Sequence, residues 1–257
     1  MGGVDGAFDE AISSIESALK KARKAWDDIV DHVNWGLKFL PDGVADQVRK
    51  STQKLGGEYH KADGWIFDLL LERGSPAALR AAAEQWNSKV LQVVSDNTKN
   101  LAFANMPSNG RWKGDAQIAY RSVVDNQNKA LDDLKGILVE LSSTLNAIAD
   151  SVKDYWIEMA VAYLGLCGAM VVCALATIGI VTIPTAIATA IGAAALFWGA
   201  VTTASNVFTN SLDSNKAKLD GLTTQNNAEG TWPLPTAEFG DGSVLDEDKK
   251  SDWEPIA

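Results

Sequence analysis

Charged residues are missing from a long internal stretch of this chain, although they are frequent elsewhere in it. No Asp, Glu, Lys or Arg occurs between Met159 and Leu212. A membrane-spanning helix needs about 20 mainly apolar residues, and the segments 159–179 and 185–207 both reach this length. Gly179 and Pro184 separate them. The stretch therefore predicts an apolar helical hairpin, and because charged residues stand only before and after it, we expect both of its ends on the same side of any bilayer.

Cysteine and histidine are also scarce, with two of each. Cys167 and Cys173 are six residues apart, which places them on different faces of a helix, so we expect two buried thiols rather than a disulfide. His32 and His60 complete no zinc-binding spacing. The sequence contains no phosphate-binding loop, and no nucleophile stands beside a base. These absences predict a protein that is not an enzyme and that holds no metal or other cofactor.

The chain lacks a basic excess. Its net charge is −10, and the segment from Asp213 onward has ten acidic residues against four basic ones, which is −6. A nucleic-acid binder needs a basic face, so this class is not expected. The first residues show no basic region followed by an apolar run, so a cleavable secretory signal is not expected either.

Amphipathic periodicity fills most of the remaining sequence. Apolar residues recur at steps of three and four over 4–33, 42–73, 76–105 and 115–158, with Gly and Pro at the connections. Four such helices joined by short turns bury their apolar stripes against one another. The sequence therefore predicts an all-α fold, an elongated antiparallel four-helix bundle over 1–158 continued by the apolar hairpin over 159–212. Residues 213–257 are predicted to form an acidic, mostly disordered tail.

Two short motifs lie at notable places in the predicted helices. Tyr59 and Asp63 are four residues apart in the second helix and share one of its faces. Trp112 and Gly114 occupy the turn between the third and fourth helices, where the Gly permits a backbone bend and the indole can cover the end of a core. A purely structural interpretation, in which Tyr59 packs in the core and Trp112 caps a turn, is about as well supported as a functional one.

The placement of these motifs carries a resemblance. A helical hairpin with Trp-x-Gly in its turn resembles the WXG-type substrates of type VII (ESX) secretion, and Tyr-x-x-x-Asp near the end of a helical hairpin is similar to the export signal of that pathway. The order of the two hairpins, over 5–73 and 76–158, is similar to a fused PE-like and PPE-like pair of the Esp kind. The resemblance implies that Tyr59 and Asp63 form the secretion signal and that Trp112 and Gly114 form a surface acting with it. It also implies the secretion machinery or a helical chaperone as partner.

The hairpin adds a membrane to these expectations. Small residues at four-residue spacing, Gly165 with Ala169 and Ala188 with Gly192, allow close contact of helices in lipid. The remaining hairpin positions that we single out are Pro184 and Trp198. The hairpin is expected either as a permanent anchor or as a segment sheltered by amphipathic helices, as in pore-forming helical toxins.

Together, the motifs and the hairpin predict a non-enzymatic, type VII secretion-associated protein, of the effector or virulence-associated kind. Its hairpin contacts membrane lipid or inserts into it, and its place is the membrane, the cell envelope or the medium, reached without a signal peptide. The alternative is a pore-forming helical effector, or a membrane-anchored adaptor with a helical-bundle head. Association into a homo-oligomer is compatible with both.

Overall fold

The structure, a computed structural model, describes residues 6–106, 112–229 and 254–255. Its α-helices are α1 (Gly6–Gly36), α2 (Asp42–Leu71), α3 (Pro76–Gln85), α4 (Gln92–Leu101), α5 (Asp115–Ala176) and α6 (Ile183–Glu229). The shorter elements are three 3₁₀ segments, η1 (Leu37–Phe39), η3 (Phe103–Asn105) and η4 (Ile180–Thr182), a π-helical segment, η2 (Trp86–Leu91), and the strands β1 (Trp112–Lys113) and β2 (Glu254–Pro255).

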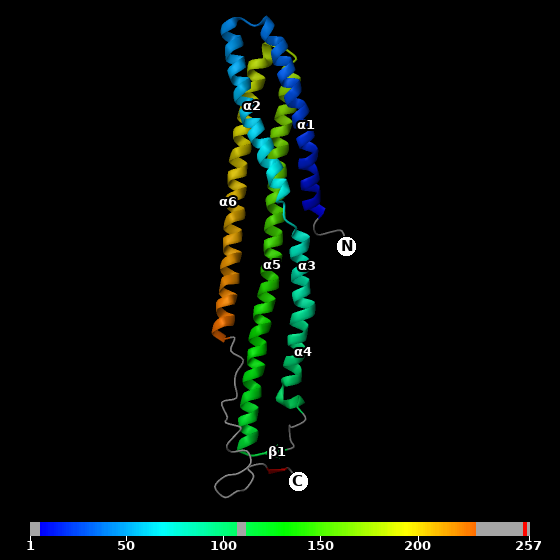
Figure 1. Ribbon diagram of the computed structural model, residues 1–257, viewed down its shortest axis with the longest axis vertical. Helices are drawn as coiled ribbons and strands as arrows, with labels where there is room; N and C mark the ends of the chain where they lie inside the picture. The colour runs from blue at the N-terminus through cyan, green and yellow to red at the C-terminus, as the bar shows by residue number, and fades with distance from the viewer. Residues whose placement is uncertain (1–5, 107–111, 230–253, 256–257) are drawn as a thin grey trace. The chain divides into compact units, whose positions relative to one another are not determined.

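Four long helices, α1, α2, α5 and α6, pack antiparallel (Figure 1). The all-α class and the antiparallel packing of four long helices are thereby confirmed. The sequence predicts that the four amphipathic helices pack together. In the structure, α1 and α2 pack instead with α5 and α6, which contain the apolar hairpin.

The chain divides into two compact units. The first contains residues 1–77 and 148–213, and the second contains residues 78–147 and 214–257. Helices α5 and α6 each contribute one part to the first unit and one part to the second. The predicted boundary between residues 158 and 159 therefore falls inside a continuous helix and inside the first unit.

The core of the first unit joins the amphipathic helices to the hairpin. Helix α1 buries the stripe that its sequence predicts, and α2 buries Val48, Leu55, Tyr59, Ala62 and Ile66. These side chains form one cluster with buried residues of 148–176 and 183–213. The hairpin is thus not an extension beyond a finished bundle. It supplies the apolar surface on which α1 and α2 bury their stripes, since neither amphipathic helix can bury its stripe alone.

The second unit has a small core on 78–105 and the first part of α5. The cluster at the centre of this core consists of the buried residues Val94, Leu131 and Leu138. A polar contact fixes the same face: the Asn87 amide donates to Ser142 Oγ over 2.8 Å, and Ser142 Oγ donates to the Ala83 carbonyl over 3.2 Å. The short strands β1 and β2 belong to this unit and pair antiparallel.

The predicted tail requires a correction at its start. Helix α6 does not end near residue 213 but continues to Glu229. Its continuation buries Asn215 and Leu222, and an ion pair joins Lys216 to Asp220 one helical turn later. The rest of the predicted tail, apart from Glu254 and Pro255, lies outside the described residues.

Candidate membrane-contacting hairpin

The apolar hairpin consists of the last part of α5, the turn η4 and the first part of α6. Helix α5 ends at Ala176, and the Thr182 hydroxyl donates to the carbonyls of Ala176 and Gly179 in the turn. Pro184 is the second residue of α6, where its missing N–H removes no helical hydrogen bond. Gly179 and Pro184 therefore separate two helices as the sequence predicts.

One face of the hairpin is covered by α1 and α2. Met159, Tyr163 and Met170 on α5 are fully buried, as are Ile183 and Ile187 on α6. Apart from the Tyr163 hydroxyl, these side chains have no hydrogen-bonding oxygen or nitrogen. The covered face is therefore an apolar surface with one phenol in it.

The opposite face of the hairpin exposes large apolar side chains. On α5 these are Val161, Leu164, Val171, Val172 and Leu175, which follow one another at steps typical of one helix face. Leu175 is 64% exposed, and on α6 Leu196 is 77% exposed. Soluble monomers rarely expose contiguous apolar patches larger than a few hundred Å². We call this set, together with Val207, the outer apolar face.

The exposure distinguishes the hairpin from an ordinary core. Two helical segments, Tyr120–Ala176 and Ile180–Thr224, are long and apolar enough to cross a membrane, a property that core helices of soluble proteins share. Core helices, however, are mostly buried. In these two segments only 44% and 33% of the most apolar window is buried. More than half of each window is therefore not buried by the part of the chain that the structure describes.

The predicted small-residue positions lie mainly on the exposed side. Gly165, Ala188 and Gly192 are exposed, and a Cβ added at either glycine would meet no atom within 4 Å. Within the described residues, no other helix therefore lies in contact with Gly165 or Gly192 at the position of a Cβ. Ala169 is half-buried and lines a shallow apolar groove of about 360 Å³ between α5 and α6. Trp198 is also half-buried, and it contacts α2 rather than the outer apolar face.

A polar cluster centred on Asp63 lies between the hairpin and helices α1 and α2, which we call the cover of the hairpin. Arg23 on α1 donates to Asp63 Oδ2 from Nε and Nη2, over 3.3 and 3.1 Å. The hydroxyls of Tyr59 on α2 and Tyr163 on α5 donate to Asp63 Oδ1, over 3.4 and 3.2 Å. We call these four residues the Asp63 cluster. One carboxylate thus connects three helices, and the Arg23 side chain that pairs with it is 56% exposed.

The electrostatics of the cluster follow from burial and from this carboxylate. The hydrogen bond and the charge of Asp63 raise the pKa of Arg23. Burial raises the pKa of Tyr59 well above its ordinary value, and the charge of Asp63 adds to the effect. At neutral pH the Arg23 guanidinium and the Tyr59 phenol therefore both keep their protons.

The predicted signal residues Tyr59 and Asp63 are both members of this cluster. Tyr59 is 2% exposed, its ring stacks on that of Trp26, and only 15% of the Asp63 side chain is exposed. In this conformation neither residue is presented on the surface for a partner to bind. Sequence reasoning paired these two residues but missed Arg23 and Tyr163. The available signal was that Tyr163 is the only Tyr in the charge-free stretch.

Further polar contacts join α1 and α2 to the hairpin. Trp198 Nε1 donates to the Glu58 carboxylate over 3.1 Å, and the Lys61 ammonium lies 4.7 Å from the centroid of the Trp198 ring. Near the tip, His32 Nδ1 lies 3.1 Å from the Ala174 carbonyl oxygen. These contacts add to the hydrogen bond that Tyr163 donates to Asp63.

The Trp-x-Gly motif lies in the second unit. Trp112 belongs to β1, and Gly114 has a φ of 102°, in the left-handed region that favours glycine. The Gly114 carbonyl accepts hydrogen bonds from the backbone N–H groups of Gln117 and Ile118, at the start of α5. Gly114 thus provides the backbone bend that the sequence predicts at this helix start.

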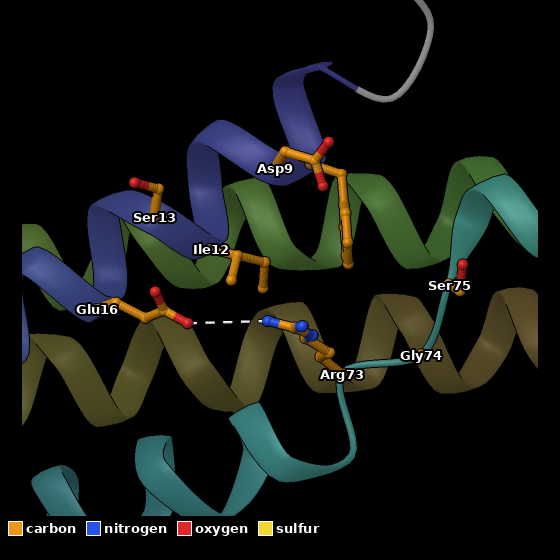
Figure 2. Close-up of a pocket in the computed structure, with 8 residues that line it drawn as sticks. Asp9, Ile12, Ser13, Glu16, Arg73, Gly74 and Ser75 are labelled. Carbon is orange, nitrogen blue, oxygen red and sulfur yellow. Dashed lines mark ion pairs between the residues drawn. The ribbon is translucent and has the colours of Figure 1, made fainter. Parts of the chain in front are cut away.

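A pocket lies beside the start of α1 and the segment that follows α2 (Figure 2). Arg73 and Glu16 face each other across it, with 3.7 Å between Nη1 and Oε1. Both side chains are more than half exposed, and exposed pairs of this kind stabilise a fold by about 0–1 kcal/mol. The Arg73 carbonyl accepts a hydrogen bond from Trp156 Nε1. These two contacts hold the segment after α2 in place. Among the described residues, no buried charged side chain that would select a ligand lines the pocket.

Comparisons with known proteins add no assignment. The chain matches no protein-family model, and neither the curated proteins nor the solved structures contain a significant match to it. Within the part of the chain that the structure describes, no three His, Cys, Asp or Glu side chains are grouped for a metal ion.

Proposed function

We propose that the protein is a non-enzymatic, envelope-associated protein whose hairpin binds a membrane through the outer apolar face. The observation that carries this proposal is the exposure of large apolar side chains along a helical pair that lacks any charged residue from Met159 to Leu212. A charged side chain at the centre of a bilayer is unfavourable by at least about 2.5 kcal/mol. A charge-free exposed face meets no such penalty.

The type VII part of the proposal is supported by the order of the two motifs in the sequence. Tyr59 and Asp63 lie in the first helical hairpin, and Trp112 and Gly114 precede α5. Secretion of wild type is to be compared with that of Tyr59→Ala and Trp112→Ala, with Tyr59→Phe as the control that keeps the buried ring. Normal export of both alanine variants would remove this part of the proposal and leave membrane binding untouched.

Membrane binding is tested by flotation with vesicles. In the test variant Val172, Leu175 and Leu196 are replaced by Gln, which changes exposed positions only and leaves the covered face intact. The matched control places three Gln residues at Val93, Ile118 and Val139, which are also exposed apolar positions but lie outside the hairpin.

We expect wild type and the control to float with the vesicles and the hairpin variant to remain in the soluble fraction. Equal flotation of the two variants would refute binding through the outer apolar face. Leakage of a trapped dye separates the alternative, a pore-forming effector, from simple surface binding. The apolar character of both hairpin faces favours this alternative as the second candidate.

A further inference from the structure

The covered face of the hairpin meets the requirements for contact with hydrocarbon as well as the outer face does. Its helical backbone is hydrogen-bonded internally, as a membrane segment requires. Hydroxyls along the hairpin donate to carbonyls of their own helix: Thr177 to Ala174, Thr189 to Thr185, Thr202 to Trp198 and Thr203 to Gly199. Side chains of the hairpin also have polar partners on the cover: Tyr163 and Trp198 on α2, and Cys167 and Thr177 on α1.

The cover, unlike the hairpin, has one charged side and one apolar side. Helices α1 and α2 are strongly charged on their outer sides and apolar on the sides that face the hairpin. Amphipathic helices of this kind are stable at a membrane interface, with the apolar side in the lipid and the charges in water. At a membrane the hairpin and the cover can therefore separate, because the apolar surface of each is then buried in lipid and is not exposed to water.

The attachment between the two is weak at its polar centre. The ion pair of the Asp63 cluster joins α1 to α2, which are both parts of the cover. The link from this cluster to the hairpin is the Tyr163 hydroxyl, 3.2 Å from Asp63 Oδ1, whereas O–H···O bonds are usually about 2.7–2.8 Å long. The ion pair of the cluster therefore joins the two helices of the cover to each other, and one long hydrogen bond joins the cluster to the hairpin.

We propose that α1 and α2 form a releasable cover of the hairpin and that Asp63 is the latch that keeps this cover closed in water. This inference rests on the proposed membrane function, which it deepens. When the cover opens, the covered face of the hairpin becomes available to lipid in addition to the outer apolar face. Surface binding through the outer apolar face then precedes insertion of the whole hairpin.

A native thiol reports this opening without a membrane. Cys167 is buried on the covered face, and its Sγ lies 3.6 Å from the Ala18 carbonyl oxygen on α1. In the full chain with Cys173→Ala, Cys167 is the only thiol. Its reaction rate with a thiol reagent in water therefore measures how often the cover leaves the hairpin.

The test compares Asp63→Asn and Tyr163→Phe with Asp68→Asn, which removes the same charge from an exposed position of α2. We expect Asp63→Asn to raise the Cys167 rate about tenfold, which corresponds to about 1.4 kcal/mol. Tyr163→Phe should raise the rate by a smaller factor, and Asp68→Asn should leave it unchanged. Equal rates in Asp63→Asn and Asp68→Asn would overturn the latch.

Denaturant dependence separates opening from unfolding. A rate that does not change at low urea concentration marks local opening, because little surface is exposed in that step, whereas a rate that rises from the first addition of urea marks global unfolding. The second result for Asp63→Asn would also overturn the proposal.

Flotation with vesicles of phosphatidylcholine and phosphatidylglycerol then tests the membrane function separately from the latch. Lack of flotation by wild type would refute the membrane function, while the thiol rates would still decide on the latch. Flotation combined with equal protease protection of the hairpin in Asp63→Asn and Asp68→Asn would refute its role in insertion.

Discussion

Two adjacent glycines in α2 provide a matched pair for testing the packing of the cover. Gly56 is buried, and a Cβ added there would lie 2.7 and 2.8 Å from two ring carbons of Trp26. A Cβ added at the exposed Gly57 would meet no atom within 4 Å. The low helix propensity of Gly makes the two residues equivalent in the sequence. The structure indicates that Gly56 makes room for an indole, whereas Gly57 does not.

The two substitutions to Ala should therefore differ in their effect on stability. Each gains about 1 kcal/mol from the higher helix propensity of Ala. Gly56→Ala also overpacks the site, which costs about 1–3 kcal/mol, because the added Cβ meets the Trp26 ring, which is stacked on Tyr59 with 5.6 Å between centroids. Gly57→Ala is expected to stabilise the protein by up to about 1 kcal/mol. Gly56→Ala is expected to be less stable than Gly57→Ala by about 1–3 kcal/mol, since the propensity gain cancels in the difference.

Urea unfolding followed by circular dichroism at 222 nm gives both free energies of unfolding. The wild-type protein and the two variants are measured at one pH and one protein concentration. If Gly56→Ala proved as stable as Gly57→Ala, the close packing of Trp26 on α2 would be refuted.

Three further predictions concern the second unit, alkaline pH and the cover. Ser142→Ala should lower the free energy of unfolding by about 1 kcal/mol in urea titrations, because the hydroxyl is buried and bonds both Asn87 and a backbone carbonyl. Burial raises the pKa of Tyr59 above the value of about 10 that it has in the unfolded chain, so stability is fully present below pH 10 and falls above it by about 1.4 kcal/mol per pH unit. Urea titrations between pH 8 and 11 check this, and an equally steep fall in Tyr59→Phe would contradict it. Ala18→Cys should form a disulfide with Cys167 on oxidation, with a gel-mobility shift that dithiothreitol reverses, and retention of both thiols would contradict the contact between α1 and α5.

The individual helices of the cover could be predicted because their burial follows a simple period. In α1 the predicted positions Phe8, Ile12, Ile15, Leu19 and Ile29 are all buried. Their spacing is fixed by the helix alone and needs no knowledge of the partner surface. The bounds of the helix differ from the prediction by only a few residues, since they depend on local breaks in the sequence.

On the third predicted helix, the apolar residues at steps of three and four include Trp86 and Val93, which are 40% and 55% exposed, whereas Ala83 and Val94 are buried. The π-helical segment η2 shifts the phase of the helix at this point. The hydrogen bonds of Ser142 fix the new face, and neither feature has a periodic signature in the sequence.

The Asp63 cluster could be predicted only in part. Tyr59 and Asp63 are neighbours on one helix, so their contact follows from spacing. Tyr163 is 100 residues further along the chain than Asp63, and Arg23 is 40 residues before it. Which helix lies beside which is decided by the packing of whole apolar faces. A pattern within one helix carries no information on that choice.

The grouping of the helices explains why the hairpin is covered on one side only. A helix without charges offers apolar surface all round, whereas α1 and α2 each have a single apolar stripe. Two such stripes can cover half of the hairpin surface, and the exposed Val172, Leu175 and Leu196 show that the other half has no cover within the described residues. Full burial would need further amphipathic surface, but the amphipathic stretch 78–147 belongs to the second unit. One face of the charge-free hairpin therefore completes a core with α1 and α2, and the other face stays exposed within the described residues.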